Sequence, residues 1–174
     1  IPYKGEITLD GEPITTANIA RLAFATCEHS FFPNLTAKGH KEFYQEHFPK
    51  FSLKRFEGLM EFFELPMNKP IRSFSTGQKN QFEVIMALCQ GADYILMDEP
   101  FVGLDPKAAV ILKSIMHDIC RRGGAIFFST HVLEVAEKLC HKVAIIKGGK
   151  LVAHGTMEEV KGQASLEQVF LELE

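Results

Sequence analysis

The chain has 174 residues, of which 46% are hydrophobic and 24% charged, and its formal net charge is −3 at pH 7. This composition is typical of one globular domain with a sizeable core and gives no reason to expect disorder. The slightly acidic balance argues against a protein that binds duplex nucleic acid, which usually carries a strong basic surplus. No apolar run approaches the ~18 residues of a membrane-spanning helix, so any membrane role is expected to need a partner.

The cysteines occur singly and form no Cys-x-x-Cys pair that would indicate zinc or redox chemistry. They are Cys27, Cys89, Cys120 and Cys140. The sequence shows no signal peptide either. We therefore expect the cysteines to be small core residues of a protein in a reducing compartment.

The first 25 residues predict short strands. The segment IPYKGEITLDGEPI alternates in the manner of a strand and has a turn signal at Asp10-Gly11, and the apolar segment LAFA ends this region. The chain starts at Ile1, within the first of these segments, rather than at a methionine. We therefore expect it to be part of a longer polypeptide.

Residues 31–74 predict a helical lobe rich in aromatic side chains. The aromatic residues recur near helical spacing, at Phe43, Tyr44, Phe48, Phe51, Phe56, Phe62 and Phe63, and basic residues lie between them. An amphipathic lobe with an aromatic core and solvated lysines explains most of this pattern. The excess of aromatic residues leaves room for a groove that docks a partner.

After Phe74 the pattern alternates between helices and strands. Helices are predicted over residues 75–89, 106–121 and 131–140, and strands over 94–97 and 125–129. Residues 142–155 predict a strand pair with a hairpin at Gly148-Gly149, and short helices over 156–161 and 165–173 follow. Apolar strands that alternate with helices indicate an α/β fold with a mainly parallel sheet and crossover helices.

Polar side chains follow two of the predicted strands. Asp98 and Glu99 end the segment YILMDEP, and His131 follows the strand AIFFS. Ligands bind at the carboxyl ends of parallel strands, where Asp98 could hold magnesium through water, Glu99 could act as general base and His131 could contact a phosphoryl group. Alternatively, the carboxylates simply point into water, and His131 enters a helix that Thr130 caps.

Two further stretches combine a helix cap with a possible phosphate site. In FSTGQKN, Ser75 and Gln78 fit a capping box, while Gly77 would bare the backbone amides of the first turn, which attract phosphate. In GLDP, Asp105 is a good N-cap before Pro106. Each stretch alone has a structural explanation, but the order and spacing of these motifs is specific.

The four motifs FSTGQ, YILMDEP, GLDP and STH together resemble the ABC transporter ATP-binding subunit family. They are similar to its signature motif, its Walker B strand with the catalytic glutamate, its D-loop and its switch histidine. The resemblance covers nearly the whole chain and implies an α/β fold of the P-loop NTPase type with an inserted helical subdomain. It implies one ABC ATPase domain over 1–174, with a strand region and Q-loop-like segment (1–28), the helical subdomain (29–90) and the Walker B, D-loop and switch-histidine core (91–174).

The resemblance also implies roles for single residues. Asp98 would help to hold Mg²⁺ through water, and Glu99 would activate the hydrolytic water. His131 would contact the γ-phosphate of ATP, and Asp105 would lie at a dimer interface. The residues that would face the ATP bound by the other subunit are Ser75, Gly77 and Gln78.

The implied function is that of an ATP-hydrolysing motor subunit of an ABC transporter. Its implied partners are a second ATP-binding subunit, in a head-to-tail dimer, and a transmembrane permease that docks on the helical lobe, with no nucleic acid. The implied location is cytoplasmic and peripheral, on the inner face of the cell membrane. The ending SLEQVFLELE is similar to that of subunits that export drugs, peptides or antibiotics.

Three departures from the family pattern qualify these expectations. No G-x-x-x-x-G-K-[ST] loop occurs, so we expect that loop to precede Ile1 in the intact protein, and we expect this polypeptide alone to be inactive. Thr76 replaces the first signature glycine and could restrict the approach of phosphate. Glu28 stands where many members have a metal-reaching glutamine; it can still accept bonds from metal-bound water but adds negative charge.

Two other classes of function stay open. One is an ATPase of the same superfamily that acts on ribosomes or DNA ends, although the chain shows neither long heptad coiled coils nor a second cassette. The other is a non-catalytic regulatory ABC subunit. The presence of Glu99 and His131 argues against the second class.

Overall fold

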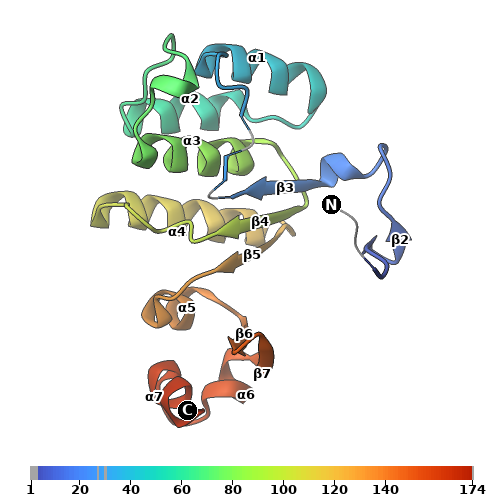
Figure 1. Cartoon of the computed structure of the whole chain (residues 1–174), viewed down its shortest axis with the longest axis vertical. Coiled ribbons are helices and arrows are strands. Elements are labelled where there is room, and N and C mark those ends of the chain that lie inside the picture. Colours follow the sequence, from blue (N-terminus) through green and yellow to red (C-terminus); the bar gives the residue numbers. More distant parts are fainter. Residues whose placement is uncertain (1–3, 27, 30, 174) are drawn as a thin grey trace. The chain divides into compact units, whose positions relative to one another are not determined.

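A computed structural model describes residues 4–26, 28–29 and 31–173 (Figure 1). The chain divides into two compact units, Ile1–Ser129 and Thr130–Glu174, and each is described by itself. Cys27 lies outside the described residues. Cys89 is fully buried as expected, whereas Cys120 and Cys140 are only half-buried.

The first unit begins with a small hairpin. Strands β1 (Thr8–Leu9) and β2 (Glu12–Pro13) pair antiparallel, with Leu9 opposite Glu12, so the turn at Asp10-Gly11 is confirmed. Asp10 and Gly11 both have positive φ angles, 53° and 82°. Such angles favour glycine and aspartate in tight hairpin turns. The short helix η1 (Ile19–Arg21) then leads into the sheet.

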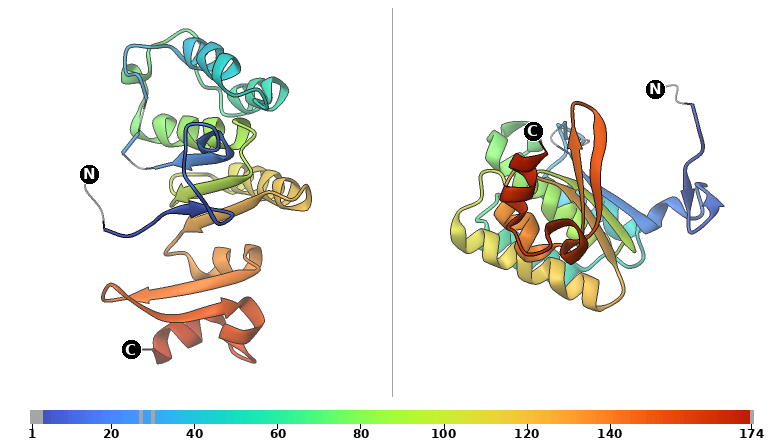
Figure 2. Two further views of the ribbon diagram at one scale, coloured as in Figure 1. Left: turned by 90° about the vertical axis from the view of Figure 1, so that its right-hand side faces the viewer. Right: turned by 90° about the horizontal axis from the view of Figure 1, so that it is seen from below.

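The central sheet is parallel and has the strand order β3-β4-β5 (Figures 1 and 2). Strand β3 is Leu22–Ala25, β4 is Tyr94–Asp98 and β5 is Ala125–Ser129. In the register, Ala25 lies beside Met97, and Asp98 lies beside Ser129. Strand β4 is therefore one residue longer than predicted, because Asp98 still pairs with its neighbour.

The two faces of this sheet differ in burial. Ala23, Ala25 and Ile95 are almost completely buried on one face, and α3 and α4 contact the sheet. On the other face, the side chains of Phe24 and Phe127 are 57% and 68% exposed. Apolar strands in a parallel sheet are usually covered on both faces. In the described part of the chain this second face is not covered, because an apolar sequence favours burial but does not itself supply the covering element.

The helical lobe consists of α1 (Ala37–His47), α2 (Leu53–Phe62), the short η2 (Ile71–Ser73) and α3 (Thr76–Cys89). Thr36 and Ser52 cap α1 and α2 by accepting backbone N–H groups in the first turn, which explains where these helices begin. Phe56 and Phe82 are completely buried in the lobe core. Truncating either to alanine would cost about 3–5 kcal/mol. The expectation of an aromatic core is thus confirmed.

Helix α4 (Pro106–Arg121) has the predicted bounds. Oδ1 of Asp105 accepts hydrogen bonds from the backbone N–H groups of Lys107 and Ala108, at 2.8 and 2.9 Å, so Asp105 is the N-cap. Pro106 at the first helical position favours the start of the helix. The positive φ of Gly123, 92°, ends it.

The second unit contains an antiparallel hairpin and three short helices. Strands β6 (Lys142–Lys147) and β7 (Lys150–Thr156) are joined by Gly148-Gly149, as predicted. Helix α5 (Leu133–Leu139) begins two residues later than predicted, while α6 (Met157–Lys161) and α7 (Leu166–Glu172) lie in their expected segments. Leu166 is the fully buried residue of its core.

Among the described residues, no helix combines the length and the apolar character that crossing a membrane requires.

Candidate functional site

The acid pair lies at the carboxyl end of the parallel sheet. Asp98 is the last residue of β4 and is exposed, and Glu99 follows it and is half-buried. Ser129, the last residue of β5, connects them: its hydroxyl donates a hydrogen bond to Asp98 Oδ1 and accepts one from the Glu99 N–H at 3.1 Å. The Glu99 N–H also lies 3.2 Å from the Ser129 carbonyl oxygen. Ser129 of the neighbouring strand β5 therefore fixes both Asp98 and Glu99.

The backbone of Glu99 has an unusual conformation. Its φ angle is 46°, in the left-handed region that residues with a side chain seldom adopt. Such a conformation costs roughly 1–3 kcal/mol and is found mostly at functional sites and switch regions. The bonds from Glu99 N–H to Ser129 hold this conformation. The strained backbone is a second sign, besides charge, that this position is specialised.

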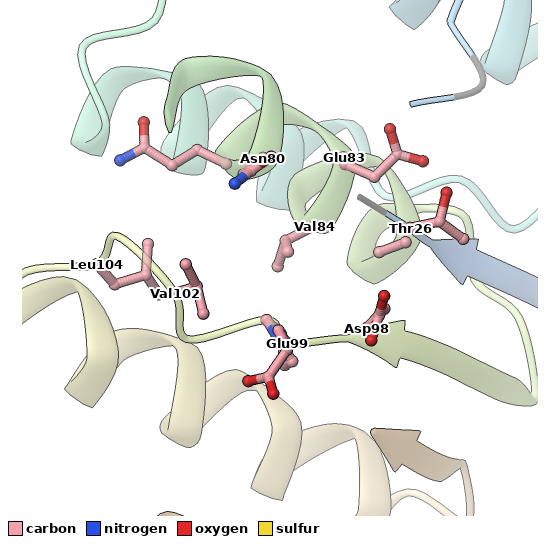
Figure 3. A pocket seen from close by; sticks show the side chains of 11 residues that line it. Thr26, Asn80, Glu83, Val84, Asp98, Glu99, Val102 and Leu104 are labelled. Carbon is pink, nitrogen blue, oxygen red and sulfur yellow. The ribbon is translucent and has the colours of Figure 1, made fainter. Parts of the chain in front are cut away.

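A small pocket lies beside the acid pair (Figure 3). It is bounded by the end of β3, the middle of α3 and the loop after β4. Thr26, Glu83, Asp98 and Glu99 contribute polar atoms to its wall, and Val84 contributes apolar surface. The geometry therefore brings the end of the sheet and the helix of the FSTGQ segment to one site.

The N-terminus of α3 has the predicted capping box. The Ser75 hydroxyl accepts a hydrogen bond from the Gln78 N–H at 3.2 Å, and Gln78 Oε1 accepts one from the Ser75 N–H at 3.0 Å. Gly77 lies between them, and a Cβ atom built there would meet open space, with only Ser75 Oγ at 4.0 Å. Ser75 and Gly77 are exposed. A helix start with this little cover can accept an anion.

A carboxylate on α3 faces the turn that follows β3. Glu83 is only 7% exposed, and burial raises its pKa to about 7, although a hydrogen bond from the backbone of Thr26 opposes the shift. Its Oε2 lies 3.5 Å from Nδ1 of His29. Burial, together with the charge of Lys79, lowers the pKa of His29. Glu28, which was predicted to reach the metal, is exposed within this turn, and its role stays a prediction.

The remaining predicted residues have separate places. Asp105 caps α4, and its side chain is exposed. His131 belongs to the second unit and is exposed in the segment before α5, where the Val132 N–H donates to Thr130 Oγ1 at 3.1 Å. The N-cap of α5 is Val132 and no side chain of the described residues caps the helix, so the alternative of Thr130 as its cap is wrong; Thr130 bonds the N–H of the cap residue instead. That His131 meets Asp98 and Glu99 stays a prediction.

The donors at the edge of the sheet suit Mg²⁺. Asp98 and Glu28 are exposed carboxylates, and Mg²⁺ prefers oxygen ligands and keeps several waters when one or two carboxylates and substrate phosphates bind it. The described residues contain no group of three or more His, Cys, Asp and Glu side chains placed to hold a metal ion. Asp98 is the residue best placed to reach a hydrated Mg²⁺, since it ends the strand.

Glu83 is the main feature of the site that sequence reasoning missed. The signal was present: a single acidic residue within the apolar run FEVIMALC, three residues before Met86, on a face of α3 that is otherwise buried. A lone carboxylate on such a face is costly without partners and so points to a specific interaction. Its partner His29 is 54 positions away in the chain, and no local pattern identifies it.

Comparisons with known proteins give the same family as the sequence motifs. The family model described as "ABC transporter" matches residues 1–102. The "Nod factor export ATP-binding protein I" of Ralstonia nicotianae is 30% identical over 168 residues, which are 92% of this chain and 52% of that protein. The "Lipopolysaccharide export system ATP-binding protein LptB" of Haemophilus influenzae is 27% identical, over 97% of this chain and 74% of that protein. The chain spans about half the length of the Nod factor export relatives that it matches.

Solved structures show the same fold. A structure described as "ATP binding subunit of ABC transporter" superposes with a TM-score of 0.85 and 26% identity, over 99% of this chain and 77% of that one. The cbiO1 protein of Clostridium perfringens, "part of the ABC transporter complex cbiONQ", has a TM-score of 0.64 at 21% identity, over 99% of this chain and 74% of that one, and supports the fold alone. The prediction of an α/β fold of the P-loop NTPase type is therefore confirmed.

Proposed function

Because the chain belongs to the ABC transporter family, we propose that it is the ATP-hydrolysing part of a motor subunit that drives a separate membrane permease. The observation that carries this proposal is the pair Asp98 and Glu99 at the end of β4, held by the Ser129 hydroxyl. An acid pair fixed at the carboxyl edge of a parallel sheet is suited to the binding and hydrolysis of a nucleotide phosphate.

Each residue of the acid pair has its own role in this proposal. The Glu99 carboxylate accepts the proton of the attacking water, as a general base within hydrogen-bond reach of it. Asp98 orients the hydrated metal ion, and Ser129 holds Asp98 in place. When bound, Mg²⁺ neutralises negative charge on the phosphate oxygens. With the ion bound, Glu28 would accept hydrogen bonds from its waters, and His131 would donate one to the γ-phosphate.

The exposed start of α3 contributes to a second nucleotide site. Ser75, Gly77 and Gln78 face the ATP held by another ATP-binding subunit in a head-to-tail dimer, where the open space beside Gly77 and the helix dipole favour phosphate. Asp105 lies at the same interface, while its Oδ1 also caps α4. This double role explains why the same short segments fit both a structural and a functional interpretation.

The partner of the motor is a transmembrane permease that docks on the helical lobe. The lobe exposes Phe32, which is 56% exposed beside Phe43, and such aromatic surface suits a partner. The names of the Nod factor and lipopolysaccharide relatives include export, so export is the proposed direction. Drugs, peptides or antibiotics are the proposed cargo class because of the ending SLEQVFLELE. We propose that the protein lies at the cytoplasmic face of the cell membrane, where it would contact the permease.

We further propose that residues 1–174 do not hydrolyse ATP by themselves. The sequence has no G-x-x-x-x-G-K-[ST] loop, whose backbone N–H groups and lysine cradle phosphates. The isolated 174-residue polypeptide should therefore show no Mg²⁺-dependent ATPase activity above that of heat-treated protein. Hydrolysis by the isolated polypeptide would contradict this part of the proposal.

The test of the main proposal is Glu99→Gln in the full protein with its permease. Glutamine keeps the shape of the side chain but cannot accept the proton, so we expect Mg²⁺-dependent ATP hydrolysis to fall by at least about 100-fold while ATP still binds. Glu167→Gln on the exposed surface of α7 is the matched control and should retain activity. Equal hydrolysis in the wild type and Glu99→Gln would overturn the role of Glu99. Activity that follows RNA or DNA rather than the permease would favour the non-transport ATPases.

A further inference from the structure

The described part of the chain contains an acidic side chain inside the contact between α3 and the turn after β3. The Glu83 side chain is only 8% exposed, and its neighbours on the same face of α3, Met86 and Ala87, are 2% exposed. A carboxylate in such surroundings loses the water that would stabilise its charge. Specific polar contacts must offset this loss for the side chain to stay buried.

The contacts of Glu83 come from the turn after β3. The backbone N–H of Thr26, just after β3, donates a hydrogen bond to the carboxylate. His29 presents Nδ1 at 3.5 Å from Oε2, and Oε2 makes no hydrogen bond with the described residues. Burial and, after it, the charge of Glu83 raise the pKa of the Tyr44 hydroxyl in α1. The contacts of Glu83 therefore join α3 to the turn after β3.

The first and last residues of a tight turn, Thr26 and His29, both contact the Glu83 carboxylate. The His29 N–H approaches the Thr26 carbonyl oxygen at 3.4 Å and closes the turn, which exposes Glu28 between them. His29 has a φ of 52°, a left-handed conformation that costs roughly 1–2 kcal/mol without compensation. Its ring stacks on Phe31, with centroids 6.2 Å apart and planes 10° from parallel. Glu83 and Phe31 together hold His29 in this conformation.

The turn leaves the sheet at the level of the acid pair. Ala25 pairs with Met97, so Thr26 is level with Asp98 at the carboxyl edge. Thr26, Glu83, Asp98 and Glu99 line the same pocket (Figure 3). Glu83 thus joins this edge to α3, the helix whose first turn bears Ser75 and Gln78.

We propose that Glu83 is a positioning residue that fixes the Thr26–His29 turn and thereby sets the orientation of Glu28 toward the metal water shell. This inference rests on the function proposed above. The carboxylate also transmits any displacement of α3 to the turn, since it bonds to the Thr26 N–H. The effect of Glu83 on hydrolysis therefore passes through Glu28 and not through contact with the nucleotide.

The first experiment measures the turn itself, in the full protein without nucleotide. Amide hydrogen exchange in the peptide from Phe24 to Phe31 should be about tenfold faster in Glu83→Ala, since the Thr26 N–H loses its acceptor. Glu83→Gln keeps an acceptor oxygen at the same place and should exchange as the wild type does. Glu57→Ala, on the exposed surface of α2, is the matched control and should leave exchange unchanged.

The second experiment measures the consequence for metal use. In ATPase assays, the Mg²⁺ concentration for half-maximal rate should rise severalfold in Glu83→Ala, with a much smaller change in the KM for ATP. Glu83→Gln should restore the wild-type requirement. A purely structural loss would lower the amount of folded protein without moving the Mg²⁺ midpoint, so a lower maximal rate at an unchanged midpoint would overturn the proposal.

The two proposals can fail separately. Wild-type protein without Mg²⁺-dependent ATPase activity, or with activity that Glu99→Gln retains, would overturn the proposed function, while the exchange data would still decide whether Glu83 fixes the turn. Unchanged exchange in Glu83→Ala would overturn the inference. If Glu83→Ala does not fold, His29→Asn tests the other contact of the turn, because asparagine tolerates the left-handed backbone and removes the imidazole from Glu83 while the acceptor of the Thr26 N–H stays in place. Exchange at the amide of residue 29, which closes the turn onto the Thr26 carbonyl, should then be faster, and unchanged exchange there would overturn the inference.

Discussion

The Ser129 hydroxyl donates a hydrogen bond to Oδ1 of Asp98 in the neighbouring strand. The same oxygen accepts the N–H of Glu99 at 3.1 Å. One small side chain thus contacts both residues of the acid pair, orienting the carboxylate of Asp98 and holding the left-handed backbone of Glu99. The parallel pairing of Asp98 with Ser129 makes this arrangement possible.

Replacing Ser129 with alanine should therefore reduce catalysis more than stability. Loss of the hydroxyl removes two hydrogen bonds at an exposed edge, which should lower the free energy of unfolding by only about 1 kcal/mol. The maximal ATPase rate should fall about 10- to 100-fold, because the two carboxylates lose their common support. Denaturant unfolding and steady-state kinetics measure the two effects. Ser114→Ala on the exposed side of α4 is the control, and wild-type kinetics in Ser129→Ala would refute the supporting role.

Ser75→Asp should separate the capping role of this residue from its proposed phosphate-facing role. Aspartate caps a helix about as well as serine and favours its N-terminal dipole, so the melting temperature should hardly change. Its charge would repel the phosphates expected there, so the ATPase rate of the dimer should fall at least about tenfold. Ser165→Asp is the matched control, because Ser165 forms the same capping box with Gln168 at the start of α7. Full activity in Ser75→Asp would exclude close phosphate contact.

Much of the fold could be predicted because local chemistry sets it. Helix α4 has the predicted bounds, since Asp105 caps it and the glycine at 123 ends it, and the hairpin at Gly148-Gly149 follows from the same kind of signal. Strand β4 runs one residue further than predicted, because Asp98 pairs with β5 rather than with anything near it in sequence. The ends of elements that depend on a neighbouring strand are thus harder to predict than capped ends.

The site was predictable only in part for a related reason. Residues such as Asp98 and Glu99 follow a strand directly, so their place at the ligand edge could be predicted from the sequence pattern. The partners that hold them could not, since Ser129 reaches Asp98 across strands and Glu83 reaches His29 across 54 positions. The exposure of Phe24 and Phe127 could not be predicted either, because an apolar pattern does not show whether another element packs against that face of the strand.

Arg21 should hold two carboxylates in their ionised form. It forms ion pairs of 2.6 Å with both Asp10 and Asp93. The hydroxyl of Tyr94 and then Arg21 lower the pKa of Asp10, and Arg21 is the main cause of the lowered pKa of Asp93. In Arg21→Gln, NMR titration should show the pKa of Asp93 rising towards its ordinary value, while that of Asp118, which Arg122 lowers, stays unchanged.

The same ion pairs predict how the Arg21→Gln difference depends on pH. A carboxyl whose pKa is lowered in the folded state adds stability above its ordinary value of 3.8, and this contribution disappears as pH falls through the lowered value. The variant should therefore be less stable than the wild type at pH 7, and the difference should shrink in acid. Unfolding curves at pH 7 and at about pH 2 measure it, and high salt should also reduce it. A difference that is independent of pH would show that Arg21 acts by packing.

Glu83 should make the stability of the folded protein depend on pH in the opposite sense. Burial raises its pKa from 4.5 to about 7, so between these values the folded protein keeps a proton that the unfolded chain has lost. Its contribution to stability is complete below pH 4.5 and is lost as pH rises through about 7. The lowered pKa of His29 acts the other way, since the unfolded chain takes up its proton first as pH falls below 6.5.

Glu83→Gln separates these two contributions, because glutamine does not titrate and His29 is present in both proteins. Relative to Glu83→Gln, the wild type should lose about 1–2 kcal/mol of unfolding free energy between pH 5 and pH 8. This loss is smaller than the free energy obtained by converting the whole pKa shift at ~1.4 kcal/mol per pKa unit. The charge of Lys79 acts on His29 in both proteins, and burial and Glu83 raise the pKa of Tyr44, so the Tyr44 hydroxyl stays protonated over this range. Glu57→Gln should show no such trend, and a constant offset between wild type and Glu83→Gln would mean that Glu83 is ionised at both pH values.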